Sequence, residues 1–182
     1  MPRKKHGADE KTRPVGGNLT EQLAAELRGG REWGQPTIHE EEFPTGLIRA
    51  TVIWDEWDHL SHEDRTAVIL QAYERAEGAA YRDLVTLASG LTVPEAYGVG
   101  MLPYQVLPAL RKGDPVTADD CRRAMVEMGA STLVAPDQPQ LRFLLEEEAE
   151  AAVKELGRRL PGSEPVWHVH REVGRVEDWA TA

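Results

Sequence analysis

The sequence contains a single cysteine, few aromatic residues and no long apolar run. Because Cys121 stands alone, no internal disulfide can form, and we expect a reducing compartment, the cytoplasm. No stretch approaches the roughly 18–20 apolar residues of a membrane-spanning helix, so we expect no membrane association. The first residues carry charges with no apolar segment behind them, which argues against a secretory signal.

Sequence patterns of known catalytic and cofactor sites are also missing. We find no phosphate-loop, dinucleotide-binding or zinc-finger spacing, and no Ser/His/Asp order of a hydrolase. Cys121 falls on the apolar stripe of a predicted helix, where burial favours a core thiol over a nucleophile. We therefore expect no catalytic residues and no cofactor, and the sequence favours a protein that is not an enzyme.

The net charge of −10 is unevenly distributed along the chain. Residues 1–17 contain five basic and two acidic residues, a net charge of +3, which leaves −13 for the remainder. Because nucleic-acid binding requires a basic face, we expect contact with nucleic acid only through residues 1–17. RNA binding by this arm, together with a KH-like or BolA-like sheet, is one alternative function.

Apolar residues make up 41% of the chain, enough for a packed core, and their periodicity predicts an α+β protein. We expect two αββαβ units in which helices pack on antiparallel or mixed sheets. The expected divisions are a flexible basic arm (1–17), a first unit (18–100), a proline-rich connector (101–116), a second unit (117–174) and a tail (175–182).

The first unit is organised around a strand and the helix that follows it. Residues 47–54 alternate between apolar and polar, as in a half-buried strand. Ser61 is a capping residue for a helix that continues to about Ala76. Residues 81–89 fit either a strand or a helix, and we favour a strand because a new capping pattern follows at Thr92.

The second unit repeats this order of elements without repeating the sequence. Thr117 caps a helix, residues 131–135 and 140–145 can form two strands, and a helix from Glu146 precedes a final strand near 165–173. Either a structural duplication or coincidence explains the repeated order. The pattern does not decide between one continuous sheet and two smaller sheets.

A part of the first unit resembles the BolA-like family, whose members share the αββαβ order. The likeness covers residues ~47–97 and rests on a strand with a following aromatic residue, an arginine that opens a helix, a second strand and a final Thr-Pro-x-Glu-like segment. These features correspond to Val52-Ile53, Trp57, Arg65 with Ile69 and Ala72, Val85-Thr86-Leu87, and Thr92-Val93-Pro94-Glu95.

The sequence departs from this family at the residues that bind metal. Thr66 stands where the family has its metal-ligand histidine, and Ala67 replaces the second arginine of the motif. The resemblance therefore implies a fold, and the family's role in sharing a metal cluster with a glutaredoxin does not carry over.

Two sets of residues are candidates for binding. His168 and His170 are two positions apart in a predicted strand and share one face, and His39 lies in another predicted strand. Together they predict a divalent metal site, and the second alternative function is therefore a metal-binding protein or a metal-dependent enzyme that uses this His-x-His strand. Trp33, Trp57 and Trp179 are expected to be exposed anchors for a partner.

Our preferred interpretation is a cytoplasmic protein-interaction module that has no catalytic activity. Abundant tryptophan in a chain with few aromatic residues is typical of contact surfaces. The expected partner is another protein or a second copy of the chain, bound through sheet edges or exposed tryptophans.

Overall fold

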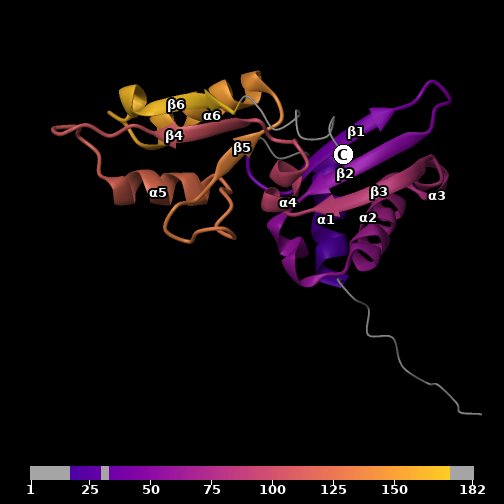
Figure 1. Ribbon diagram of the computed structural model, residues 1–182. Helices are drawn as coiled ribbons and strands as arrows, with labels where there is room; N and C mark the ends of the chain where they lie inside the picture. The colour runs from indigo at the N-terminus through magenta and orange to yellow at the C-terminus, as the bar shows by residue number, and fades with distance from the viewer. Residues whose placement is uncertain (1–16, 30–32, 173–182) are drawn as a thin grey trace, which may run out of the picture.

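The structure is a computed structural model that describes residues 17–29 and 33–172. The strands form two three-stranded sheets and the helices pack against them, which confirms the α+β class (Figure 1). In chain order the elements are α1 (Gly17–Gly29), β1 (Thr37–Glu42), β2 (Ile48–Ile53), the 3-10 helix η1 (Asp55–His59), α2 (His62–Glu77), α3 (Ala79–Arg82), β3 (Val85–Leu91), α4 (Val93–Gly98), β4 (Tyr104–Pro108), α5 (Ala118–Glu127), β5 (Leu141–Phe143), α6 (Glu146–Arg159), the 3-10 helix η2 (Glu164–Val166) and β6 (Trp167–Arg171).

The first sheet has the strand order β1-β2-β3, with β1 antiparallel and β3 parallel to β2. A parallel pair needs a crossover connection, and α2 supplies it. The short helix α3 occupies the start of the stretch predicted as a strand at 81–89, and the strand itself begins at Val85. The predicted order of helix, strand, strand, helix and strand is therefore confirmed, with the third strand displaced toward the C-terminus.

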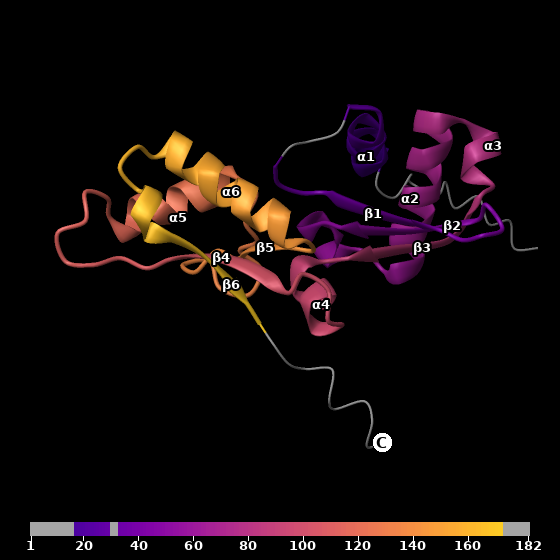
Figure 2. The same cartoon turned by 90° about the horizontal axis from the view of Figure 1, so that it is seen from above.

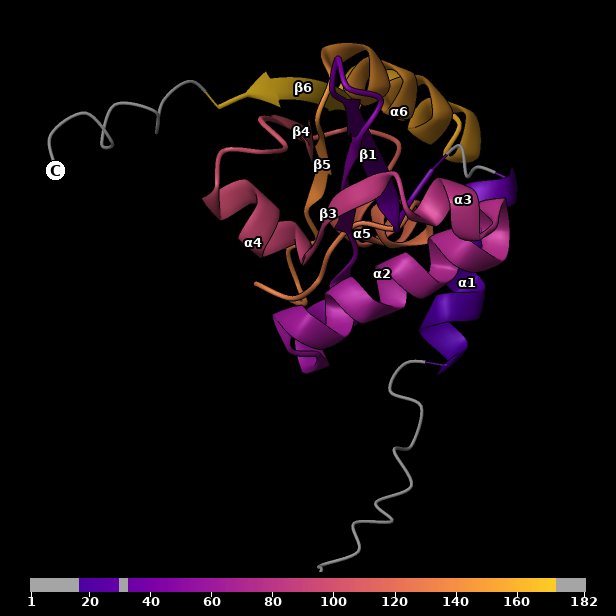
Figure 3. The ribbon, with the colours of Figure 1, turned by 90° about the vertical axis from the view of Figure 1, so that its right-hand side faces the viewer.

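Alternation in β2 produces the core of the first sheet. Ile48, Ala50 and Val52 point to one face, where they pack against Ile69 and Tyr73 of α2. Helices α1 and α2 lie side by side under this face, as Figure 3 shows from the end of the molecule. Both helices thus leave the opposite face of the sheet to the short helix α4 and to solvent.

The second sheet has the order β5-β4-β6, and both outer strands are antiparallel to the central β4. The prediction of an irregular connector at 101–116 is wrong for Tyr104–Pro108, because these residues form that central strand. Pro103 precedes the strand and Pro108 is its last residue, so both prolines occupy strand ends, where a missing N–H is tolerated. Val106 between them is fully buried.

The predicted strand at 131–135 is also wrong. Only Ser131 pairs, exchanging two backbone hydrogen bonds of 2.8 Å with Gln140. Leu133 and Val134 are exposed, and the place beside β5 in the sheet is taken by β4, which comes earlier in the chain. The second half therefore follows the order β4-α5-β5-α6-β6.

Helices α5 and α6 cover one face of the second sheet. They lie on the same side of the molecule as α1 and α2, which cover the first sheet, while α4 lies on the opposite side (Figure 2). Val106, Leu141 and Trp167 of the three strands pack against Met125 and Leu156 of the two helices. Among the described residues, no helix has both the length and the apolarity needed to cross a membrane.

Gln35 joins the two sheets at the junction between them. Its Nε2 donates hydrogen bonds of 3.1 Å both to the Asp55 carboxylate, after β2, and to the Gly129 carbonyl, after α5. Asp55 also accepts a hydrogen bond of 3.1 Å from the backbone N–H of Val93 at the start of α4. These contacts fix the distance between the two sheets and so set the shape of the space between them.

Candidate functional site

The three tryptophans that we predicted as exposed anchors have different environments. The prediction is wrong for Trp57, which is fully buried in η1, and its Nε1 donates a 3.0 Å hydrogen bond to the Val52 carbonyl. Trp54 packs against Trp57 edge to face, with ring centroids 5.2 Å apart. Trp33 is partly buried against the second core, and Trp179 lies outside the described residues.

The predicted metal ligands lie on different sheets. His168 and His170 are exposed on one face of β6, as their spacing predicts, whereas His39 is exposed on β1 of the first sheet. Across residues 17–29 and 33–172, no group of three or more His, Cys, Asp or Glu side chains is placed to hold a metal ion. These three histidines are therefore not brought together.

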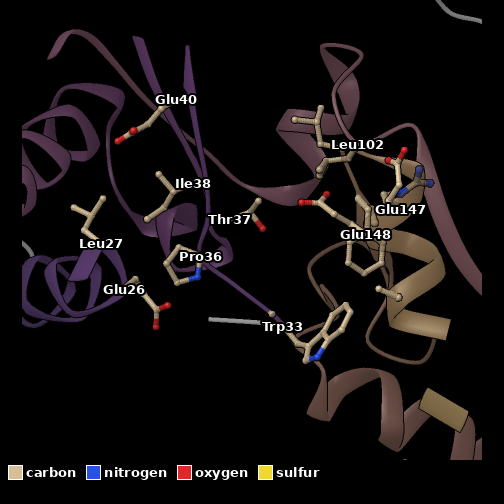
Figure 4. A pocket seen from close by; sticks show the side chains of 15 residues that line it. Glu26, Leu27, Trp33, Pro36, Thr37, Ile38, Glu40, Leu102, Glu147 and Glu148 are labelled. Atoms are coloured by element: carbon tan, nitrogen blue, oxygen red, sulfur yellow. The ribbon is translucent and has the colours of Figure 1, made fainter. Parts of the chain in front are cut away.

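A cleft of about 700 Å³ lies between the two sheets. Pro36 and Ile38 lie on one side of it, Leu102 lies on the other, and Trp33 lies at the bottom of the view (Figure 4). Apolar side chains line both sides of the cleft. They are Leu27, Trp33, Pro36 and Ile38 from the first half, and Leu102, Phe143, Leu144 and Ala151 from the second.

Four carboxylates surround these apolar residues. Glu26 and Glu40 approach from the side of α1 and β1, and Glu147 and Glu148 lie opposite on α6 (Figure 4). The lining contains a single basic residue, Arg142. Because four carboxylates and one basic residue line the cleft, its lining is mainly acidic, which favours cationic over anionic ligands.

Arg142 does not neutralise these carboxylates, because it is already engaged elsewhere. Its side chain is only 4% exposed, its Nη2 donates a 3.2 Å bond to Glu172, and its guanidinium stacks 3.8 Å from the centre of the Tyr97 ring. The Tyr97 hydroxyl also donates to Glu172, and together with Arg142 it holds the pKa of this carboxyl below its usual range. This cluster ties α4 to β5 and β6.

Glu40 is held by two tyrosines of the first unit. The Tyr73 hydroxyl donates to its Oε1, and the Tyr81 hydroxyl lies 3.4 Å from its Oε2. The two rings are stacked with centroids 6.1 Å apart. Burial, together with the neighbouring Glu40 carboxylate, raises the pKa of Tyr73, so its hydroxyl stays protonated and continues to donate. Glu40 is therefore fixed in place at the edge of the cleft.

Cys121 is buried among the side chains of the second core. Burial raises the pKa of its thiol, and nearby Asp120 adds to this effect. A thiol with a raised pKa has little thiolate at neutral pH and reacts slowly. The position agrees with the core role expected from its place on the helix.

No protein-family model, curated protein or solved structure matches this chain.

Sequence reasoning did not identify the cleft, although part of its signal is visible. Leu144, just before α6, and Glu147, Glu148 and Ala151 of the helix follow the spacing i, i+3, i+4, i+7, which marks a second face beside the buried stripe of α6. The same glutamates are also favourable charges at a helix N-terminus, so the pattern alone does not indicate a binding surface. The matching wall around Glu26 is more than 100 residues earlier, and only the tertiary fold brings it close.

Proposed function

We propose that this chain is a protein-interaction module, without catalysis of its own, that binds a basic and apolar segment of a partner protein in the cleft. The observation that carries the proposal is the combination of apolar walls with four glutamates in one hollow. Apolar contact supplies affinity, and the carboxylates select lysine or arginine over acidic side chains.

The dimensions of the cleft suit a short peptide. A volume of about 700 Å³ falls within the roughly 300–1,000 Å³ that is typical of ligand pockets. Trp33 lines the cleft while its ring packs on the second core, so a bound segment would meet a rigid aromatic surface. Rigid aromatic residues are common anchors in protein interfaces.

The charges also bear on whether the partner is a second copy of the chain. β1 is an edge strand and ends in three consecutive glutamates, Glu40, Glu41 and Glu42. Two such edges placed together would repel each other, which is a known protection against edge-to-edge pairing. We therefore propose a different protein as the partner, in place of self-association.

A selection of random peptides displayed on phage tests this proposal. Twelve-residue peptides are selected on the full chain, and the enriched sequences are synthesised. Their affinities are then compared for E147Q/E148Q and for the control E146Q/E150Q. Both double variants remove two negative charges from the first turns of α6, but Glu146 and Glu150 do not line the cleft.

The expected result is enrichment of peptides rich in basic and apolar residues. Exposed ion pairs contribute about 0.2–1 kcal/mol each, so loss of two should weaken binding roughly 2- to 30-fold in E147Q/E148Q. The control variant should bind like the native chain. Failure to enrich any peptide, or equal losses in both variants, would show that the cleft is not the binding site.

A further inference from the structure

The cleft is bordered by the free edges of both sheets. β1 has β2 as its single strand neighbour among the described residues, and Thr37, Ile38 and Glu40 of β1 line the cleft. β5 is the edge strand of the second sheet, and its residues Arg142 and Phe143 line the same cleft. The two sheets thus come close at the cleft but are not joined by a strand pair.

An edge strand presents unpaired backbone groups to whatever lies beside it. In an antiparallel pair, alternate residues of the outer strand direct their N–H and C=O groups away from the partner strand. For β1 these groups face away from β2, on the side of the strand that is free. A ligand lying against this edge covers them and removes them from water.

This desolvation distinguishes between the possible shapes of a bound segment. A helix satisfies its own backbone groups internally and would leave those of β1 without partners, at a cost of about 1–3 kcal/mol for each buried group. An extended chain pairs with these groups directly. The free edge of β1 therefore favours an extended ligand over a helical one.

We propose that the partner segment binds as an added fourth strand on β1, an inference that rests on the proposed function of the cleft. Its side chains alternate between the two faces of the sheet. One set lies in the cleft between α1 and α6, against the apolar lining that includes Leu27 and Phe143. The acidic residues at the end of β1 select a partner strand that carries basic residues.

Two capped octapeptides of equal composition test the proposal on the full chain. One alternates Lys and Leu, the pattern of a strand, and the other repeats Leu-Lys-Lys-Leu, close to the pattern of a helix. Fluorescence polarisation measures the affinity of each labelled peptide for the native chain, E147Q/E148Q and E146Q/E150Q. We expect the alternating peptide to bind the native chain at least about tenfold more tightly than its isomer does. We also expect it to bind E147Q/E148Q less tightly than it binds the native chain or E146Q/E150Q.

Two further peptides probe the backbone pairing itself. In one, the backbone nitrogen of every leucine of the alternating peptide is methylated. In the other, the backbone nitrogen of every lysine is methylated. Because successive residues point their N–H groups to opposite edges, only one methylated peptide should lose affinity, by about tenfold or more. The other should bind within about threefold of the parent peptide.

The outcomes separate this inference from the function on which it rests. Three outcomes would overturn strand addition and leave the interaction function intact. They are equal binding of the two isomers, unchanged binding of both methylated peptides, and no binding of the alternating peptide while phage-selected peptides bind. If no octapeptide and no selected peptide binds in a manner sensitive to E147Q/E148Q, the proposed function itself fails.

Discussion

Replacement of Gly129 by alanine should loosen the junction between the two sheets. Gly129 has a φ of +81°, and a Cβ added there would lie 2.4 Å from the Gly34 Cα and 3.1 Å from the Gln35 nitrogen. The nearest neighbours are backbone atoms, which cannot rotate away as a side-chain end can. The variant must therefore move the segment at Gly34, whose neighbour Trp33 lines the cleft.

Two effects contribute to the expected loss of stability. The left-handed backbone costs a residue with a side chain about 1–2 kcal/mol, and overpacking at a rigid contact adds about 1–3 kcal/mol. G129A should therefore lower the free energy of unfolding by roughly 2–5 kcal/mol. With a urea dependence of about 1–3 kcal/mol per molar, the unfolding midpoint should fall by roughly 0.7–5 M. Selected peptides should also bind G129A more weakly.

Gly113 provides the matched control for this experiment. Its φ of +100° carries the same backbone cost, but no heavy atom lies within 4 Å of an added Cβ. G113A should therefore lose only about 1–2 kcal/mol and keep its affinity for peptides. A midpoint for G129A no lower than that of G113A would refute the close approach as the cause.

Three other measurements test the core and its charged groups. Trp57→Ala should cost about 3–5 kcal/mol in urea unfolding, whereas an exposed anchor would cost little. The Tyr73 hydroxyl has a pKa near 10 in the unfolded chain and a higher pKa in the folded chain, so its contribution to the free energy of unfolding is complete below pH 10. Above pH 10 this contribution falls by about 1.4 kcal/mol per pH unit. Y73F should remove this part of the pH dependence of the unfolding free energy. Hydrogen bonds from Arg158 and Arg159 lower the pKa of Glu155 to about 2, and NMR titration of R158A/R159A should show it rising toward the ordinary value.

Local chemistry made much of the fold predictable. Ser61, Thr92 and Thr117 were expected to begin helices, and each accepts a hydrogen bond from the backbone N–H three residues later. The alternation at 47–54 likewise predicted β2, whose inward side chains are buried. These signals could be read because the residues that interact are close together in the sequence.

The errors arise where distant residues decide the structure. The prolines near β4 suggested an irregular connector, but the antiparallel partners at Leu141–Phe143 and Trp167–Arg171 make Tyr104–Pro108 the centre of a sheet. The abundance of tryptophan suggested exposed anchors, yet Trp57 is buried and its Nε1 donates a hydrogen bond to the Val52 carbonyl. No local pattern reports these long-range contacts, and the same holds for the cleft, whose walls come from both halves.

The strand order explains why a cleft exists at this place. β1 and β5 are edge strands that line one hollow, and pairing between them would have produced a continuous sheet and closed it. Gln35 instead holds Asp55 and Gly129 together, which sets the spacing between the two sheets. The opening is thus maintained by specific contacts, so the G129A variant tests the basis of binding as well as stability.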